Sequence, residues 1–196
     1  MKITIDGREI EVTEEKAQGL REFLGIRRKL LSEVSVGDTF RIGEYEFIKF
    51  ADSNGQTTAV MRDSVFDSSF DDSTNNFAKS LLYKRLVKEV LPKIEKIVGI
   101  ENIIEFKTDL FTADGLDIYG TMKSKIGLPT FDFYRQNRAI FEKYPMADWW
   151  WTSTANGNEQ YVFCVSPRGI IGYNSDCRRD IGVRPFLIFD SNIFVS

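Results

Sequence analysis

The chain has 196 residues, 42% of them hydrophobic and 13% aromatic, which is enough for one domain of ordinary size with a substantial core. Its net charge of −3 leaves no basic excess to hold phosphates, so the composition disfavours a nucleic-acid platform. The sequence contains no His, which removes the usual general base and the commonest metal ligand.

The sequence has two cysteines, Cys164 and Cys177. Two thiols cannot supply a four-ligand zinc site, and we expect them to behave as small buried hydrophobic residues. Residues 1–7 lack the apolar core of a signal peptide, and no apolar run approaches membrane-spanning length. We therefore expect a protein of the bacterial cytoplasm with reduced thiols.

The first 35 residues predict a small appendage. Residues 2–5 and 9–12 alternate around an Asp-Gly pair, which is typical of a β-hairpin. Thr13 is a suitable N-cap for a helix that runs to about Leu24, where Gly25 can end it.

Residues 36–62 predict an antiparallel meander. Strands are expected at residues 39–42, 45–50 and 57–62, and Asn54-Gly55 is a strong hairpin turn.

Residues 63–76 are rich in Ser, Asp and Asn and predict a loop. Asp67, Asp71 and Asp72 have the chemistry of hard-cation ligands, but their spacing does not match an EF-hand. A polar loop with a helix cap is the favoured interpretation, and calcium binding stays open as the alternative.

The segment up to Gly99 predicts a long amphipathic helix that packs on the core. Pro92 lies inside it and should kink the helix or begin a second one. The apolar stripe consists of Leu82, Leu86, Val90, Ile94 and Ile97.

A strand is expected over residues 103–110, followed by a turn region at 112–120 and a short helix over 131–144 with many aromatic residues. The last third predicts strands at residues 161–165 and 170–174 around a Ser-Pro-Arg-Gly turn, and a final strand at 184–189.

Three tryptophans stand in a row at residues 149–151. In an extended chain Trp149 and Trp151 point one way and Trp150 the other, so at least one ring should be buried and one can lie near the surface. Arg184, in the sequence Gly-Val-Arg-Pro, is a candidate to stack on one of these rings.

The Trp-Trp-x-Thr-Ser run, the Ser-Pro-x-Gly turn and the Gly-Val-Arg-Pro element resemble a poorly characterised domain family of Firmicutes bacteria and their phages. That family is similar to the C-type lectin-like fold, in the branch shared with formylglycine-generating enzymes and retroelement-diversified phage receptor proteins. The resemblance implies an α+β fold with antiparallel sheets and flanking helices over residues 36–196, after an appendage at 1–35.

The resemblance implies that the tryptophan and Gly-Val-Arg-Pro elements are scaffold and that the loops around the last strands bind ligands. The scaffold residues would be Trp149, Trp150, Trp151, Gly182, Arg184 and Pro185. The ligand-binding residues would be Asn156, Asn158, Gln160, Arg168, Tyr173, Asn174, Asp176, Arg178 and Arg179.

The chain departs from the enzymatic and sugar-binding relatives. It lacks the Glu-Pro-Asn, Gln-Pro-Asp and Trp-Asn-Asp motifs of calcium-dependent sugar-binding lectins. Formylglycine-generating enzymes use a close cysteine pair, whereas Cys164 and Cys177 are far apart in sequence. We therefore expect no metal and no cofactor.

The leading hypothesis is a non-enzymatic, phage- or prophage-encoded protein that binds a macromolecular ligand, expected to be a protein, through these loops. It would inhibit a host defence system, such as a CRISPR system, in the bacterial cytoplasm. The alternatives are a virion component for receptor recognition, a calcium-independent glycan binder, and an enzyme. An enzyme without His would have to use pairs of Asp or Glu, or Lys, Tyr or Cys, and we consider carboxylates first. The candidates are Glu101, Glu105, Asp109, Asp114 and Asp117.

Overall fold

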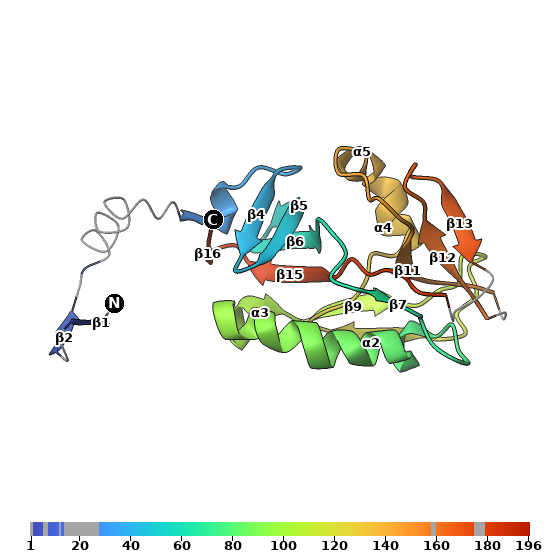
Figure 1. Ribbon diagram of the computed structural model, residues 1–196, viewed down its shortest axis with the longest axis horizontal. Coiled ribbons are helices and arrows are strands. Elements are labelled where there is room, and N and C mark those ends of the chain that lie inside the picture. The colour runs from blue at the N-terminus through green and yellow to red at the C-terminus, as the bar shows by residue number, and fades with distance from the viewer. Residues whose placement is uncertain (1, 6–7, 12, 14–27, 158–159, 175–178) are drawn as a thin grey trace.

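The computed structural model describes residues 2–5, 8–11, 13, 28–157, 160–174 and 179–196. They form a mixed α+β fold built mostly from antiparallel sheets, as expected (Figure 1). The helix expected between Thr13 and Gly25 lies outside the described residues.

The first large sheet has five strands in the order β4-β5-β6-β15-β8. Its bounds are β4 Thr39–Ile42, β5 Tyr45–Ser53, β6 Gln56–Met61, β15 Phe186–Asp190 and β8 Ile103–Ile104. The predicted meander is confirmed, with a turn at Asn54 and Gly55, which both have positive φ angles of 53° and 73°. β15 closes the meander by pairing with β6 on one side and with β8 on the other.

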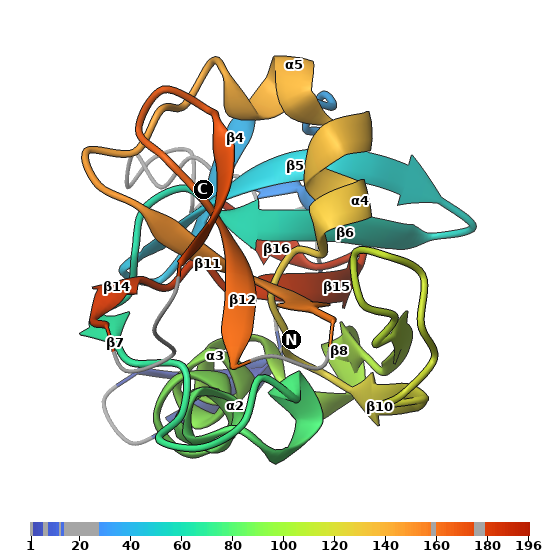
Figure 2. The same cartoon turned by 90° about the vertical axis from the view of Figure 1, so that its right-hand side faces the viewer.

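The second large sheet has the order β13-β12-β11-β14-β7. Its bounds are β11 Trp150–Asn156, β12 Tyr161–Val165, β13 Ile171–Asn174, β14 Ile181–Gly182 and β7 Asp67–Ser68. All pairs are antiparallel except β11 with β14. In Figure 2, β12 runs at a steep angle to β5 and β6.

Three small strand pairs complete the described β-structure. β1 Lys2–Ile5 pairs with β2 Arg8–Glu11, which confirms the expected hairpin. β9 Phe106–Asp109 pairs with β10 Thr121–Ser124, and β3 Lys29–Leu30 pairs with β16 Phe194–Val195.

Because β3 pairs with β16, the main body begins before residue 35, the boundary expected from the sequence. Leu31, in the 3-10 helix η1 (Leu31–Glu33), and Val34 are buried in the main core. The boundary expected at residue 35 therefore lies inside the packed body, because β16, from the far end of the chain, holds this segment in place.

The long helical segment is confirmed, but it is not one regular α-helix. It consists of η2 Phe77–Lys79, α2 Leu81–Arg85, a π-helical turn η3 Leu86–Val90 and α3 Leu91–Val98. Pro92 lies in the first turn of α3, where its missing N–H costs little, and the π-turn immediately precedes it. Leu82, Leu86 and Ile94 are fully buried, whereas Ile97 of the predicted stripe is 52% exposed.

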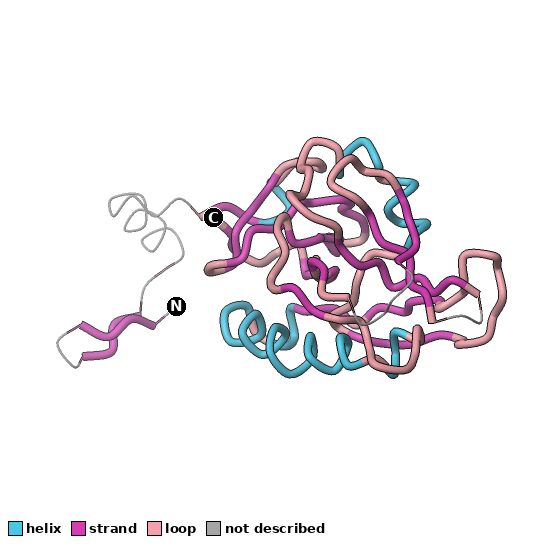
Figure 3. The backbone as a smooth tube through the Cα atoms, turned by 45° about the vertical axis from the view of Figure 1, so that its right-hand side comes forward, coloured by secondary structure: helices cyan, strands magenta, loops and turns pink. Residues whose placement is uncertain are grey.

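Two shorter helices, α4 Phe131–Gln136 and α5 Arg138–Phe141, replace the single helix expected over residues 131–144. The Thr130 side chain caps α4 by accepting a hydrogen bond from the N–H of Phe133 at 3.0 Å. A 3-10 turn, η4 Ile100–Asn102, leads into β8. Figure 3 shows strands lying between the long helical segment on one side and α4 and α5 on the other.

The core consists of two clusters of buried side chains, and the tryptophan run contributes to both. Trp151 is buried in the larger cluster and Trp149 packs against that cluster while partly exposed. Trp150 is buried in the smaller cluster, which Tyr134 and Phe141 share. This confirms the expectation that alternate rings of the run face opposite sides.

Candidate functional site

Those predicted ligand-binding residues that the structure describes lie at both ends of the second sheet. Asn156 ends β11 opposite Tyr161, and Asn174 ends β13 opposite Val162, so these two positions and Gln160 lie at one end of the second sheet. Arg179 is exposed just before β14. Asn158, Asp176 and Arg178 lie outside the described residues, and only the backbone of Tyr173 and Asn174 is described.

Arg168 lies at the opposite end of the same sheet. It belongs to the turn between β12 and β13, where the N–H of Gly169 donates to the carbonyl of Ser166 at 2.9 Å. The five residues of β12 separate this turn from the other end by roughly 15 Å. Arg168 therefore cannot share a small ligand with Asn156, and the role of each in binding stays a prediction.

A groove of about 550 Å³ lies between β9 and α4, near the predicted loops. Its apolar lining consists of Phe106, Phe111, Leu128, Phe131, Phe133, Phe186 and Ile188. Phe106 and Phe133 both pack on the ring of Phe186, at 4.9 and 5.1 Å between ring centres. The floor of the groove is therefore fixed by mutual ring packing rather than by mobile side chains. We call this feature the β9 groove.

All four residues of β9 line this groove. Because successive side chains of a strand point to opposite faces, a groove that touches all four must run along the edge of the strand. Within the described part of the chain β9 pairs only with β10, so this second edge has no strand partner.

The register identifies the backbone groups on that edge. The N–H of Leu110 donates to the carbonyl of Gly120 at 2.9 Å. Hydrogen-bonded pairs occur at every second residue of an antiparallel ladder, so Thr108 and Phe106 also bond to β10, whereas Lys107 and Asp109 do not. The N–H and carbonyl groups of Lys107 and Asp109 therefore point away from β10, toward the groove.

The charges around the groove are already paired. Lys107 lies 3.3 Å from Asp109, and Arg135 lies 2.8 Å from Asp132. These pairs are exposed and contribute little to stability, but they leave the groove without an excess of either charge. The groove is therefore suited to an uncharged, apolar occupant.

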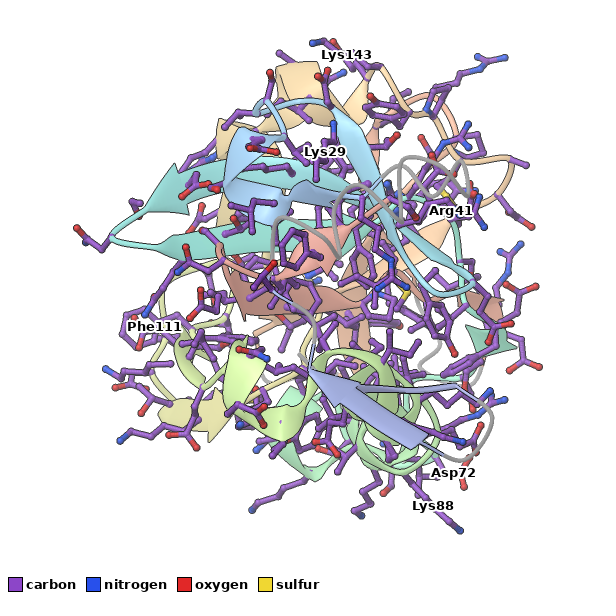
Figure 4. All side chains as sticks on the ribbon, turned by 90° about the vertical axis from the view of Figure 1, so that its left-hand side faces the viewer. Lys29, Arg41, Asp72, Lys88, Phe111 and Lys143 are labelled. Atoms are coloured by element: carbon purple, nitrogen blue, oxygen red, sulfur yellow. The ribbon has the colours of Figure 1, made fainter. Side chains whose placement is uncertain are left out.

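Exposed apolar side chains lie next to the groove, in the loop between β9 and β10. Phe111 is 46% exposed, and Leu116 and Ile118 are 44% and 40% exposed. Figure 4 labels Phe111 at the outer edge of the molecule. Neighbouring exposed apolar residues of this kind are typical of a contact surface.

The groove adjoins the loop that the sequence predicted to bind ligands. The N–H of Ala113 donates to the carbonyl of Ala155 at 3.0 Å, and Thr154 of β11 lines the groove. Asn156 and Gln160 thus belong to the same end of the molecule as the groove. The aromatic lining residues were not predicted from the sequence. The apolar residues in the turn around Gly115 were the one signal of a contact surface there.

The Gly-Val-Arg-Pro element makes close contacts with the tryptophan run and with β6. A side chain at Gly182 would approach the carbonyl oxygen of Trp149 to 3.0 Å, so only glycine fits there without a shift. The carbonyl of Pro185 accepts from the N–H of Met61 at 2.9 Å, which extends the pairing of β15 with β6 by one residue.

Arg184 stacks on Trp150 as expected. The centre of its guanidinium lies 5.1 Å from the Trp150 ring centre and 5.2 Å from that of Phe141. Arg184 is buried, and burial lowers the pKa of its guanidinium to about 10, with Asp63 acting in the opposite direction.

The acidic loop at residues 63–76 is a helix-capping element. The Asp71 carboxylate accepts hydrogen bonds from the N–H groups of Ser73, Thr74 and Leu81 at 2.8, 3.2 and 2.8 Å. Burial raises the pKa of this carboxyl, but those hydrogen bonds lower it below its usual value overall. The described residues contain no group of three or more acidic or thiol side chains placed to hold a metal ion.

The residues considered for catalysis are dispersed on the surface. Each of the five candidate carboxylates is exposed. Cys164 is buried in the larger core cluster, and Cys177 lies outside the described residues.

No helix among the described residues has the length and apolar character needed to cross a membrane. Comparison with protein-family models, with curated proteins and with solved structures found no match to this chain.

Proposed function

We propose that the chain is a non-enzymatic binding protein that captures an extended segment of a partner protein in the β9 groove. The observation that carries this proposal is the unpaired edge of β9 inside a groove with aromatic walls. An extended peptide can add a strand to such an edge, with backbone hydrogen bonds supplying affinity and side-chain pockets supplying specificity.

The groove supports both parts of this recognition mode. Lys107 and Asp109 offer backbone donors and acceptors along its length. Phe131, Phe133 and Phe186 line the groove across from β9. Alternate side chains of the peptide would pack against these rings. Because the nearby charges are paired within the chain, the segment that binds should be apolar in its centre.

The loops at residues 156–160 and 173–179 would extend the contact beyond the groove. Their Asn, Tyr and Arg residues provide adaptable hydrogen bonding around an apolar centre. We further propose that the fold is C-type lectin-like and that the chain is a phage- or prophage-encoded inhibitor of a host defence system. The Trp-Trp and Gly-Val-Arg-Pro elements, which pack here as a scaffold, support this narrower proposal.

A random linear-peptide library displayed on phage would test the binding activity with defined probes. We expect enriched peptides to share apolar residues at alternate positions. Phe111→Ser, at the rim of the groove, should weaken their binding about tenfold, because an exposed aromatic contact is lost. Ile170→Ser is the matched control, because Ile170 is 57% exposed but lies in the distant β12–β13 turn. Equal binding by both variants, or no enriched peptide, would contradict the proposal.

A further inference from the structure

A second, smaller cavity of about 190 Å³ lies at the other end of the second sheet. It is lined by residues of α4, α5, the segment after α5 and the β12–β13 turn. Tyr134, Phe141, Tyr144 and Trp150 form its aromatic walls, and Arg184 is part of its lining.

Arg184 is 1% exposed, and its hydrogen bonding is incomplete. Its Nε donates to the carbonyl of Met61 at 3.0 Å, whereas its Nη2 is buried and has no hydrogen-bond partner among the described residues. No described carboxylate lies within 4.0 Å of it, so the guanidinium has no ion-pair partner there.

This arrangement is costly for the free protein. With a pKa of about 10, the guanidinium stays positively charged at neutral pH although burial disfavours the charge. The rings of Phe141 and Trp150, which both lie close to the guanidinium, offset part of that cost, but ring faces do not satisfy an N–H donor. An anion that entered the cavity would give the guanidinium both a counter-charge and an acceptor.

We propose that this cavity binds an organic carboxylate attached to a small flat apolar group, with the carboxylate on Arg184 and the apolar group between the aromatic walls. A planar guanidinium matches a planar carboxylate in two parallel hydrogen bonds. The volume fits this class, because an engineered cavity of about 150 Å³ holds one benzene molecule. Drug-sized ligands need about 300 Å³ or more, so the ligand must be small.

The rim of the cavity favours entry of an anion. Arg168 is exposed at the rim and adds a second positive charge. The one carboxylate in the lining, that of Glu142, is held by Arg138 at 2.7 Å. Glu142 therefore does not compensate Arg184.

This proposal does not depend on the β9 groove, because α4 separates the two features. Phe131 and Phe133 of α4 face the groove, whereas Tyr134 lines the cavity and donates its hydroxyl hydrogen to the carbonyl of Gly169 at 2.8 Å. Either site can be tested without the other.

The test is an NMR titration of the full chain with benzoate, with benzamide as the uncharged isostere and inorganic phosphate as a second anion. We expect benzoate to shift the Trp150 indole signal with a Kd of about 1 mM, and to bind at least about tenfold more tightly than the other two probes. Arg184→Met should weaken benzoate binding by about tenfold or more. Arg168→Gln should weaken it only a few-fold, because Arg168 is solvated.

A second variant tests the cavity in case Arg184→Met does not fold. Met146→Trp adds bulk to the half-buried rim of the cavity and leaves Arg184 in place, and it should also weaken benzoate binding. Equal affinity for benzoate and benzamide would overturn the proposal, as would equal affinity for phosphate. Unchanged benzoate binding in a folded Arg184→Met or Met146→Trp variant would overturn it too.

Discussion

The guanidinium of Arg184 lies over the ring of Trp150, 5.1 Å from its centre. β14 pairs in parallel with β11 at Trp150 and Gly182. Trp150 begins β11, and Arg184 follows the end of β14 by two residues. Their contact joins the Gly-Val-Arg-Pro element to the tryptophan run. Tyr134 of α4 and Phe141 of α5 pack on the same Trp150 ring, at 5.7 and 5.4 Å between ring centres.

The two sides of the tryptophan run should respond differently to truncation. Trp150→Ala removes a fully buried ring that contacts Tyr134 and Phe141, and it should cost about 3–5 kcal/mol of unfolding free energy. Trp149→Ala removes a partly exposed ring and should cost clearly less. Urea unfolding of both variants measures the difference, and equal losses would contradict the assigned burial.

Asp71 should stabilise the fold in a pH-dependent manner. Its pKa is lower in the folded chain than the usual 3.8, so its contribution is present above about pH 3.8 and is lost as the pH falls through the folded-state pKa. Asp71→Ala should cost roughly 1–2 kcal/mol at pH 7, because three N–H groups lose their acceptor.

The loss in Asp71→Ala should shrink when unfolding is measured below pH 3.8. Asp72→Ala is the matched control, since Asp72 is exposed and should change stability little at either pH. A loss in Asp71→Ala that stays constant with pH would rule out the capping carboxylate as its cause.

Lys49 and Asp52 form a pair that ties the start of the body to β5. Lys49 is 1% exposed, and its ammonium group donates to Asp52 at 2.5 Å and to the carbonyl of Leu31 at 2.8 Å. Asp52→Ala should cost about 3 kcal/mol, because it leaves a buried cation without its carboxylate. Adding Lys49→Met to Asp52→Ala should recover part of that loss in a thermal-unfolding series. Additive losses would show that the two residues are not coupled.

The sequence allowed the local elements to be predicted because local signals determine them. Asn54-Gly55 sets the β5–β6 hairpin, and the stripe through Leu82 and Leu86 predicts the helix. Pro92 was expected to disturb that helix, but no residue pattern indicated the π-turn that accommodates it.

The long-range features could not be predicted, because they depend on segments far apart in the chain. The sequence does not predict that Lys49 is buried, because its partners, Asp52 and the carbonyl of Leu31, are brought to it only by the fold. The β9 groove is a similar case. Residues 103–110 predict a strand, but only the structure shows that Ile104 pairs with β15 while Lys107 faces an open groove.

The central claim, that the edge of β9 pairs with an extended segment, is tested most directly by one pair of proline variants. Lys107→Pro removes a backbone N–H that points into the groove, while the β10 ladder is kept. Lys123→Pro removes the opposite N–H, on the outer edge of β10, and is matched in residue type and exposure.

The measurement is the affinity of a library-selected peptide for both variants by fluorescence polarisation. We expect Lys107→Pro to weaken binding by about tenfold or more and Lys123→Pro to leave it unchanged. Equal affinities for the two variants would contradict strand addition at β9.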